Sequence, residues 1–471
     1  MENGLKRKYG LFTAICLVVG IVVGSGVFFK AQTILQKTGG DMPLGILAWA
    51  IGGAIMLFCM LAFANMATKY EKVNGIVDYA EAMVGGRYAY FVGWFMTTIY
   101  YPAMTSVLAW LSARYTLVFI TSVEPSFPLL PLGGDAAGAE PVMGMECIVL
   151  MLFYLCAAYA VNALSPKLAG KLQVSTTVIK FIPLVLMAAV GIIYGIASGT
   201  LTENFRSVAD VAASDVKSNP LLASVCATSF AYEGWIIATT INAELKDAKK
   251  NLPRALIIGG IIIVAIYILY YIGVAGGATN RELIEEGATV AFTNVFGNVL
   301  GNILNLFIAV SCIGTMNGLM LGACRGMYSI ASRNRGPAYK TFKQIDAVTN
   351  MPNNSAVMAL ILCAFWGFYF ILANLTGSGS SWFGPFVFDS SELPIVAIYA
   401  FYLPIFVMWM VKSRGVGILK RFVIPTLAIA GSLFMIYSCI RAHGMANIWF
   451  LLLTAVVMAV GAFFCNEKKD D

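Results

Sequence analysis

Runs of about 20 apolar residues recur along the whole chain, and they constrain its fold more than any other feature. A helix of that length spans about 30 Å, the thickness of the hydrocarbon core of a bilayer. Apolar residues make up 59% of the 471 residues and charged residues only 12%, with a mean hydropathy of +0.80. No apolar run is followed by a segment with the composition of a soluble domain. The chain is therefore expected to be an all-α membrane protein.

Twelve transmembrane helices are expected, and an even number places both termini on one side. Most of the 31 lysines and arginines fall at that side, in segments such as ELKDAKKNLPR and SRNRGPAYKTFK, so both termini are predicted to be cytoplasmic. The net charge of +7 is then explained mostly by these cytoplasmic lysines and arginines. Membrane lipid is expected as a secondary partner, and nucleic acid is not expected. The basic N-terminus lacks a signal-peptide cleavage site, so the first run is expected to be retained. The expected spans are 10–38, 43–68, 88–120, 144–163, 172–197, 222–242, 254–278, 298–331, 354–374, 391–411, 421–440 and 446–465.

Two spans carry interruptions at mid-membrane depth. Span one reads GIVVGSGVFFKAQ, with Gly24, Ser25 and Gly26 in a row, and span six contains SFAYEGW at 229–235. Glycines in a span either allow close helix packing or mark a break whose freed backbone groups bind something else. Paired interruptions at equivalent places indicate the binding site of a transporter built as an inverted repeat. The predicted halves are 1–200 and 201–415, with peripheral spans and a tail in 416–471.

The ends of two broken helices would suit an amino acid. If span one breaks at the glycines, its outer half begins near Val27, and the free N–H groups and positive dipole end there suit a carboxylate. The inner half ends near Val22 and the first half of span six near Ala231, where free carbonyls suit an ammonium group. A site with donors on one side and acceptors on the other matches the α-carboxyl and α-amino groups of an amino acid.

Three segments together resemble the amino acid–polyamine–organocation (APC) superfamily, and within it the L-amino acid exchanger branch and bacterial amino acid permeases. They are GIVVGSGVFF, SFAYEGW followed by AELKDAKKNLPRAL, and SCIGTMNGLMLGACRGMYSIASRNRGP. The resemblance implies a LeuT-type 5+5 inverted repeat with discontinuous helices one and six, and transport by alternating access. It implies that Phe230 covers the substrate from outside as a gate. The substrate-binding groups that it implies are Gly24, Ser25 and Gly26 for the carboxylate, and the carbonyls of Val22, Phe230, Ala231 and Glu233 for the amine.

Lys180 lies inside span five, roughly 13 Å from its basic end at helical rise. A lysine there either snorkels or forms a fixed ammonium bonded to helix one and span eight, near Ser311. It matches the lysine at the corresponding place of the family's fifth span. The resemblance implies that this ammonium replaces a bound sodium ion, and therefore that transport does not depend on sodium. Burial of the lysine also leaves a role in proton coupling open.

Glu233 departs from the pattern of transporters for large neutral substrates. Its carboxylate could attract a cationic side chain, bind a proton, pair with Lys180, or simply be hydrated.

The sequence thus predicts a sodium-independent antiporter, or permease, of L-amino acids in the cell membrane, with proton-coupled or exchange transport of cationic amino acids or polyamines as the alternative. No catalytic residue, metal site or cofactor is expected: there is no paired intramembrane aspartate, His443 reads as a surface residue and the ten cysteines as packing residues. A transporter-like sensor stays open. The eukaryotic exchangers that this chain resembles use a cysteine in the loop after span three to bond a heavy chain. This loop has no cysteine, so the resemblance implies no disulfide-linked heavy chain and a better match to a bacterial permease.

Overall fold

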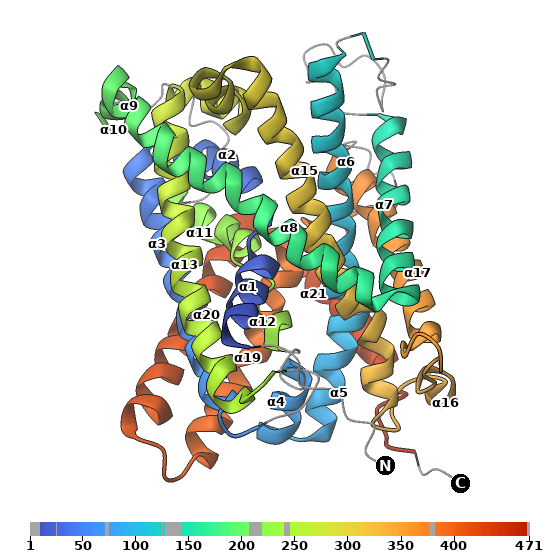
Figure 1. Cartoon of the computed structure of the whole chain (residues 1–471). Helices are drawn as coiled ribbons and strands as arrows, with labels where there is room; N and C mark the ends of the chain where they lie inside the picture. Colours follow the sequence, from blue (N-terminus) through green and yellow to red (C-terminus); the bar gives the residue numbers. More distant parts are fainter. Residues whose placement is uncertain are drawn as a thin grey trace.

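Each apolar run of the sequence forms one or two helices, and the helices lie side by side as one bundle (Figure 1). The computed structural model describes residues 10–468, apart from 25, 71–74, 125, 128–143, 207–218, 240–244 and 376–381. These described residues form no β-strand. A helix pairs its backbone polar groups internally, which is what an apolar span requires where water is absent.

Eleven spans in the described part are long and apolar enough to cross a membrane. A twelfth results if α1 (Leu11–Val22) and α2 (Gly26–Thr38), bent by 43° relative to each other, cross as one. The predicted all-α membrane protein is confirmed, with eleven or twelve spans. The others are formed by α3 (Met42–Ala67); α5 (Gly86–Phe95), the π-helical turn η1 (Met96–Tyr100) and α6 (Tyr101–Val123); α7 (Met145–Leu164); α8 (Pro166–Leu186), η2 (Met187–Gly191) and α9 (Ile192–Ser198); α11 (Pro220–Ala231) and α12 (Trp235–Ala238); α13 (Ala248–Gly277); α15 (Ala288–Ala331); α17 (Asn353–Phe370) and η5 (Ile371–Leu375); α19 (Leu393–Lys412); η6 (Leu419–Val423) and α20 (Ile424–His443); and α21 (Met445–Ala462).

Short helices mark the two ends of the bundle. In Figure 1, α4 (Ile76–Met83) and α16 (Tyr339–Phe342) lie at the bottom, whereas α9 and α10 (Thr200–Arg206) lie at the top. A further short helix, α14 (Asn280–Glu286), packs on α2. Arg333, just after α15, forms ion pairs with Asp78 and Glu81 of α4. We call the end of the bundle that carries α4, α16 and Arg333 the basic end. The termini themselves, 1–9 and 469–471, lie outside the described residues, as does most of the loop after α6.

The chain is broken at the two places where the sequence predicts it. Helix α1 ends at Val22 and α2 begins at Gly26, while Ser25 between them lies outside the described residues. Helix α11 ends at Ala231 and α12 begins at Trp235. The residue before α12 is Gly234, whose φ of 97° favours glycine because a Cβ is strained there.

Packing brings both breaks to the interior. Helix α2 packs on α11, α1 packs on α13, and α15 packs on α6 and α8. Three buried aromatic residues pack together beside the second break. The ring of Trp49 lies 5.6 Å from that of Tyr232 and 5.6 Å from that of Tyr267. Such edge-to-face aromatic contacts add to the burial of the rings themselves, so the helices around the breaks are firmly held.

Candidate functional site

The two helix breaks lie against each other. A Cβ atom added to Gly26 would lie 2.5 Å from the Cα of Ala231 and 3.1 Å from the carbonyl oxygen of Phe230. Only a residue without a side chain fits at such a contact. The start of α2 and the end of α11 therefore touch through their backbones, and the free N–H end of one helix faces the carbonyl end of the other.

A cavity of about 30 Å³ lies at this contact. We call it the central cavity. Its walls come from both breaks and from η1, α6, α15 and α19. The lining residues are Val22, Gly24, Gly26, Tyr100, Met104, Leu108, Phe230, Glu233, Gly234, Thr315, Leu319 and Ile395. Of the predicted substrate-binding residues, this set includes Val22, Gly24, Gly26, Phe230 and Glu233.

Tyr267 of α13 lies behind the cavity and was missed by the sequence analysis. Its hydroxyl lies 3.1 Å from the carbonyl oxygen of Val22 and 3.1 Å from that of Ala231, and it donates to both. Both carbonyls are among those predicted to receive an ammonium group. One hydroxyl proton shared between two acceptors leaves lone pairs on each oxygen, so both carbonyls keep the capacity to accept a further donor.

Glu233 faces Tyr100. The Tyr100 hydroxyl donates to Glu233 Oε1 over 2.5 Å, and the glutamate side chain is buried. Tyr100 is the last residue of η1, a π-helical turn of the kind that is frequent at functional sites. No hydrogen bond or ion pair joins Glu233 to Lys180 among the described residues, so the pairing that the sequence left open is absent from this conformation.

Lys180 of α8 is fully buried and does not snorkel. Its ammonium donates to the carbonyl oxygen of Gly20 in α1 and, over 3.2 Å, to the hydroxyl of Thr315 in α15. Ser311, which was expected near the ammonium, lies one turn earlier on α15, and its buried hydroxyl has no partner among the described residues. The partner of Lys180 on α15 is thus Thr315, which also lies against the first break: a Cβ on Gly24 would lie 2.5 Å from its Oγ1.

Phe230 forms part of the cavity wall and is 8% exposed. Its ring lies 6.3 Å from that of Phe29, and the ammonium of Lys30 lies 5.4 Å from its centre. Two of the predicted residues that the structure describes do not line the cavity: Val27, which is fully buried in the first turn of α2, and Ala231 at the end of α11.

A buried ionic cluster lies beside this wall. Glu392, directly before α19, forms ion pairs with Lys30 and Lys37 of α2 and lies 2.9 Å from the Nε2 atom of His443. The prediction that His443 is a surface residue is wrong, because its side chain is only 15% exposed. Sequence reasoning missed the cluster because its members lie in different spans.

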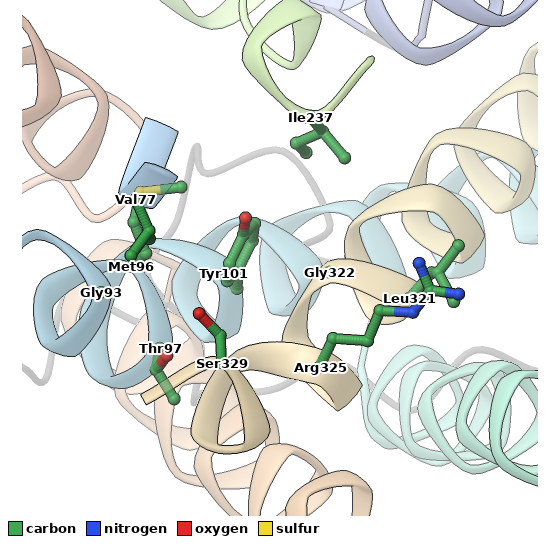
Figure 2. Close-up of a pocket in the computed structure, with 11 residues that line it drawn as sticks. Val77, Gly93, Met96, Thr97, Tyr101, Ile237, Leu321, Gly322, Arg325 and Ser329 are labelled. Carbon is green, nitrogen blue, oxygen red and sulfur yellow. The ribbon is translucent and has the colours of Figure 1, made fainter. Parts of the chain in front are cut away.

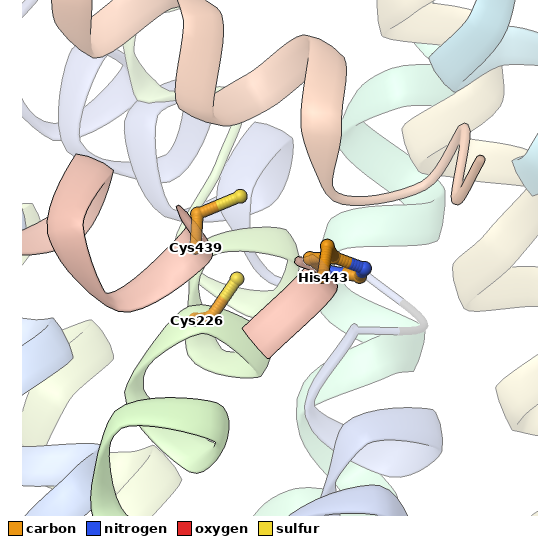
Figure 3. A group of neighbouring side chains, drawn as sticks. All are labelled: Cys226, Cys439 and His443. Carbon is orange, nitrogen blue, oxygen red and sulfur yellow. The ribbon is translucent and has the colours of Figure 1, made fainter. Parts of the chain in front are cut away.

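Figure 3 shows His443 beside Cys226 and Cys439. The two sulfur atoms and a ring nitrogen lie within 4.8 Å of one another, a donor set of the kind that binds zinc. The His443 ring, however, already contacts Glu392, and the two lysine ammonium groups on that carboxylate disfavour a metal cation nearby.

A model of the amino acid permease family matches residues 9–463, which is nearly the whole chain. The chain belongs to the amino acid permease family. It is a multi-pass membrane protein of the APC superfamily, whose members are transporters and not enzymes.

Three relatives illustrate the range of the family. The serine/threonine exchanger SteT of Bacillus subtilis is 28% identical over 459 residues, which cover 94% of each chain. The Asc-type amino acid transporter 1 of Mus musculus is 26% identical over 361 residues, 76% of this chain and 63% of the relative. The human cystine/glutamate transporter is 26% identical over 330 residues, 70% of this chain and 62% of the relative. This permease thus matches nearly the whole length of the bacterial exchanger and less than two thirds of the length of these mammalian transporters.

Proposed function

We propose that this permease exchanges L-amino acids across the cell membrane by alternating access, without sodium. The observation that carries the proposal is the contact of the two helix breaks at the central cavity. The N-terminal end of α2 offers N–H groups and a positive dipole end near Gly26, and the ends of α1 and α11 offer carbonyls. A zwitterion is the small molecule that satisfies both sides at once.

The amino acid is oriented by these two sets of groups. Its carboxylate lies at the glycines of the first break, Gly24 and Gly26, with Ser25 between them. Its ammonium lies at the carbonyls of Val22 and Ala231, where it shares the acceptors of the Tyr267 hydroxyl. Phe230 closes the cavity toward the α2 side.

Sodium independence rests on Lys180. Its fixed ammonium joins the carbonyl of Gly20 to Thr315, and so links α1 to α15. A lysine ammonium bonded near the end of a broken helix would take the place of a bound sodium ion, as the resemblance to the family implies.

The side-chain end of the cavity is small and largely apolar. Met104, Leu108, Leu319 and Ile395 line it, and its free volume of about 30 Å³ must increase before any substrate enters. A small neutral side chain requires the least opening, and it is consistent with the name of the serine/threonine exchanger among the relatives. Glu233 favours the second candidate, transport of cationic amino acids or polyamines, because its carboxylate lines the same cavity.

Uptake of labelled amino acids into liposomes with purified protein tests the proposal. The liposomes are preloaded with one amino acid or with none, with and without sodium, and with and without a proton gradient. We expect uptake only into preloaded liposomes, equal in sodium and potassium, with serine, threonine and alanine preferred over lysine. Uptake into empty liposomes driven by an inward proton gradient would contradict exchange. A preference for lysine, arginine or polyamines would establish the second candidate. No uptake by correctly folded protein would refute both.

A further inference from the structure

A second cavity, drawn in Figure 2, is lined by residues of α15 that lie further along the helix than those of the central cavity, toward the basic end. We call it the inner cavity. Neighbouring residues line the two: Tyr100 the central cavity and Tyr101 the inner one, Leu319 the central and Leu321 the inner. Its volume is about 40 Å³, similar to that of the central cavity. The two cavities therefore lie in succession along one face of α15, as two stations of one path would.

The wall of the inner cavity is held closely by two glycines of α15. A Cβ on Gly322 would lie 2.8 Å from the ring of Tyr101, and a Cβ on Gly326 would lie 2.6 Å from Oγ1 of Thr97. Helix α15 therefore packs closely against η1 and α6. Arg325 lies between these glycines in sequence and belongs to the same wall (Figure 2).

Arg325 is the one charged residue among those that line the inner cavity in the described part of the chain. The other polar side chains that line this cavity are those of Thr97, Tyr101 and Ser329. A guanidinium stays protonated at every physiological pH, so the cavity carries a permanent positive charge.

No carboxylate of the described residues pairs with Arg325. The contrast with Arg333, two turns further along, is informative, because Asp78 and Glu81 both form ion pairs with it. A partly buried charge without a partner is costly, and the positions of its donors suit a planar carboxylate. Among the described residues, Arg333, just after α15, is thus paired with acidic side chains, whereas Arg325 within α15 has no carboxylate partner.

We propose that Arg325 binds the α-carboxylate of the amino acid in the inner cavity, on its way between the central cavity and the basic end. This inference rests on the proposed transport function. Six residues separate Leu319 from Arg325, which places the two stations about 9 Å apart along the helix. The carboxylate leaves the N–H groups at the first break and is received by a bidentate guanidinium, so it does not cross an apolar wall without a partner.

Amino acid exchange, measured separately from each face of the membrane, tests this role. The variant R325Q removes the charge and keeps hydrogen-bonding capacity, and R325K keeps a charge without the bidentate geometry. The matched control is R281Q, which makes the same charge change at a residue that is 79% exposed in α14. The protein is inserted into liposomes in one orientation, and the half-saturating L-serine concentration is measured separately on each face.

We expect R325Q to raise the half-saturating L-serine concentration at least about tenfold on the membrane face at the basic end and less than twofold on the opposite face. R325K should fall between R325Q and the wild type, and R281Q should resemble the wild type. A charge-assisted bidentate contact is worth about that factor. An equal change on both faces would mean a merely structural role and would overturn the proposal, as would no change on either.

Carboxylate binding without transport provides the second readout. Propionate has the carboxylate but lacks the ammonium that the carbonyls of the central cavity require. We expect it to raise the unfolding temperature of the wild-type protein and of R281Q at concentrations at least about tenfold lower than those needed for R325Q. Equal responses would refute the inner station. If the wild-type protein transports no amino acid, the proposed function fails, and the propionate response still decides whether Arg325 binds a carboxylate. If R325Q does not fold, R325K against wild type gives the same comparison.

Discussion

Gly26 is the closest contact between the two broken helices, and alanine at this position tests whether that contact controls transport. An added Cβ would lie 2.5 Å from the Cα of Ala231, whereas carbon atoms without strain approach to about 3.5 Å. The start of α2 and the end of α11 must therefore separate by roughly 1 Å, since neither contact is the flexible end of a side chain. Overpacking of this kind costs about 1–3 kcal/mol. The conformation with both ends in contact then loses about 5- to 150-fold in population.

The assay is the initial rate of amino acid exchange in liposomes, with insertion and thermal unfolding measured on the same preparations. Gly417 provides the matched control, because a Cβ added there meets no atom within 4 Å. We expect G26A to lose at least fivefold in exchange rate or in apparent affinity, and G417A to resemble the wild type. Unchanged rate and affinity in correctly inserted G26A would show that the contact of the breaks does not define the substrate site.

Two further substitutions bear on the mechanism. Lys180→Ala removes the donor from the Gly20 carbonyl and from Thr315, which costs about 1–3 kcal/mol for each stranded group. Exchange should fall tenfold or more while the protein still inserts, and wild-type exchange rates in this variant would remove Lys180 from the mechanism. Glu233→Ala should weaken competition by lysine or arginine more than competition by alanine, if cationic substrates bind at all. Competition assays that show equal losses for all three would leave no support for the cationic candidate.

The positions of the helices follow closely from the sequence. Apolar runs fix the spans, and the predicted start of span eight at residue 298 directly follows Gly297, whose φ of 78° interrupts α15. Both breaks were found because glycine at mid-membrane depth is costly for a helix and needs a reason.

The contacts between helices are harder to predict from the sequence. Ser311 and Thr315 lie one turn apart on the same face of α15, and sequence alone does not give the vertical register of α8 against α15 that selects Thr315 for Lys180. Tyr267 was missed for another reason: a tyrosine inside an apolar span looks like a packing residue until its hydroxyl is seen at two carbonyls. The ion pair of Lys30 with Glu392 joins residues 362 positions apart, and no local pattern indicates it.

The π-helical turn Met96–Tyr100 determines which of two consecutive tyrosines faces which cavity. Tyr100 lines the central cavity and Tyr101 the inner one. A π turn contains one residue more than an α turn, and each residue of an α-helix rotates the chain by about 100°. Loss of a single residue from this turn would therefore change the side chains presented to both cavities without any substitution. Within this family, an alignment gap at these five positions would thus mark a change of pocket chemistry that residue-by-residue comparison overlooks.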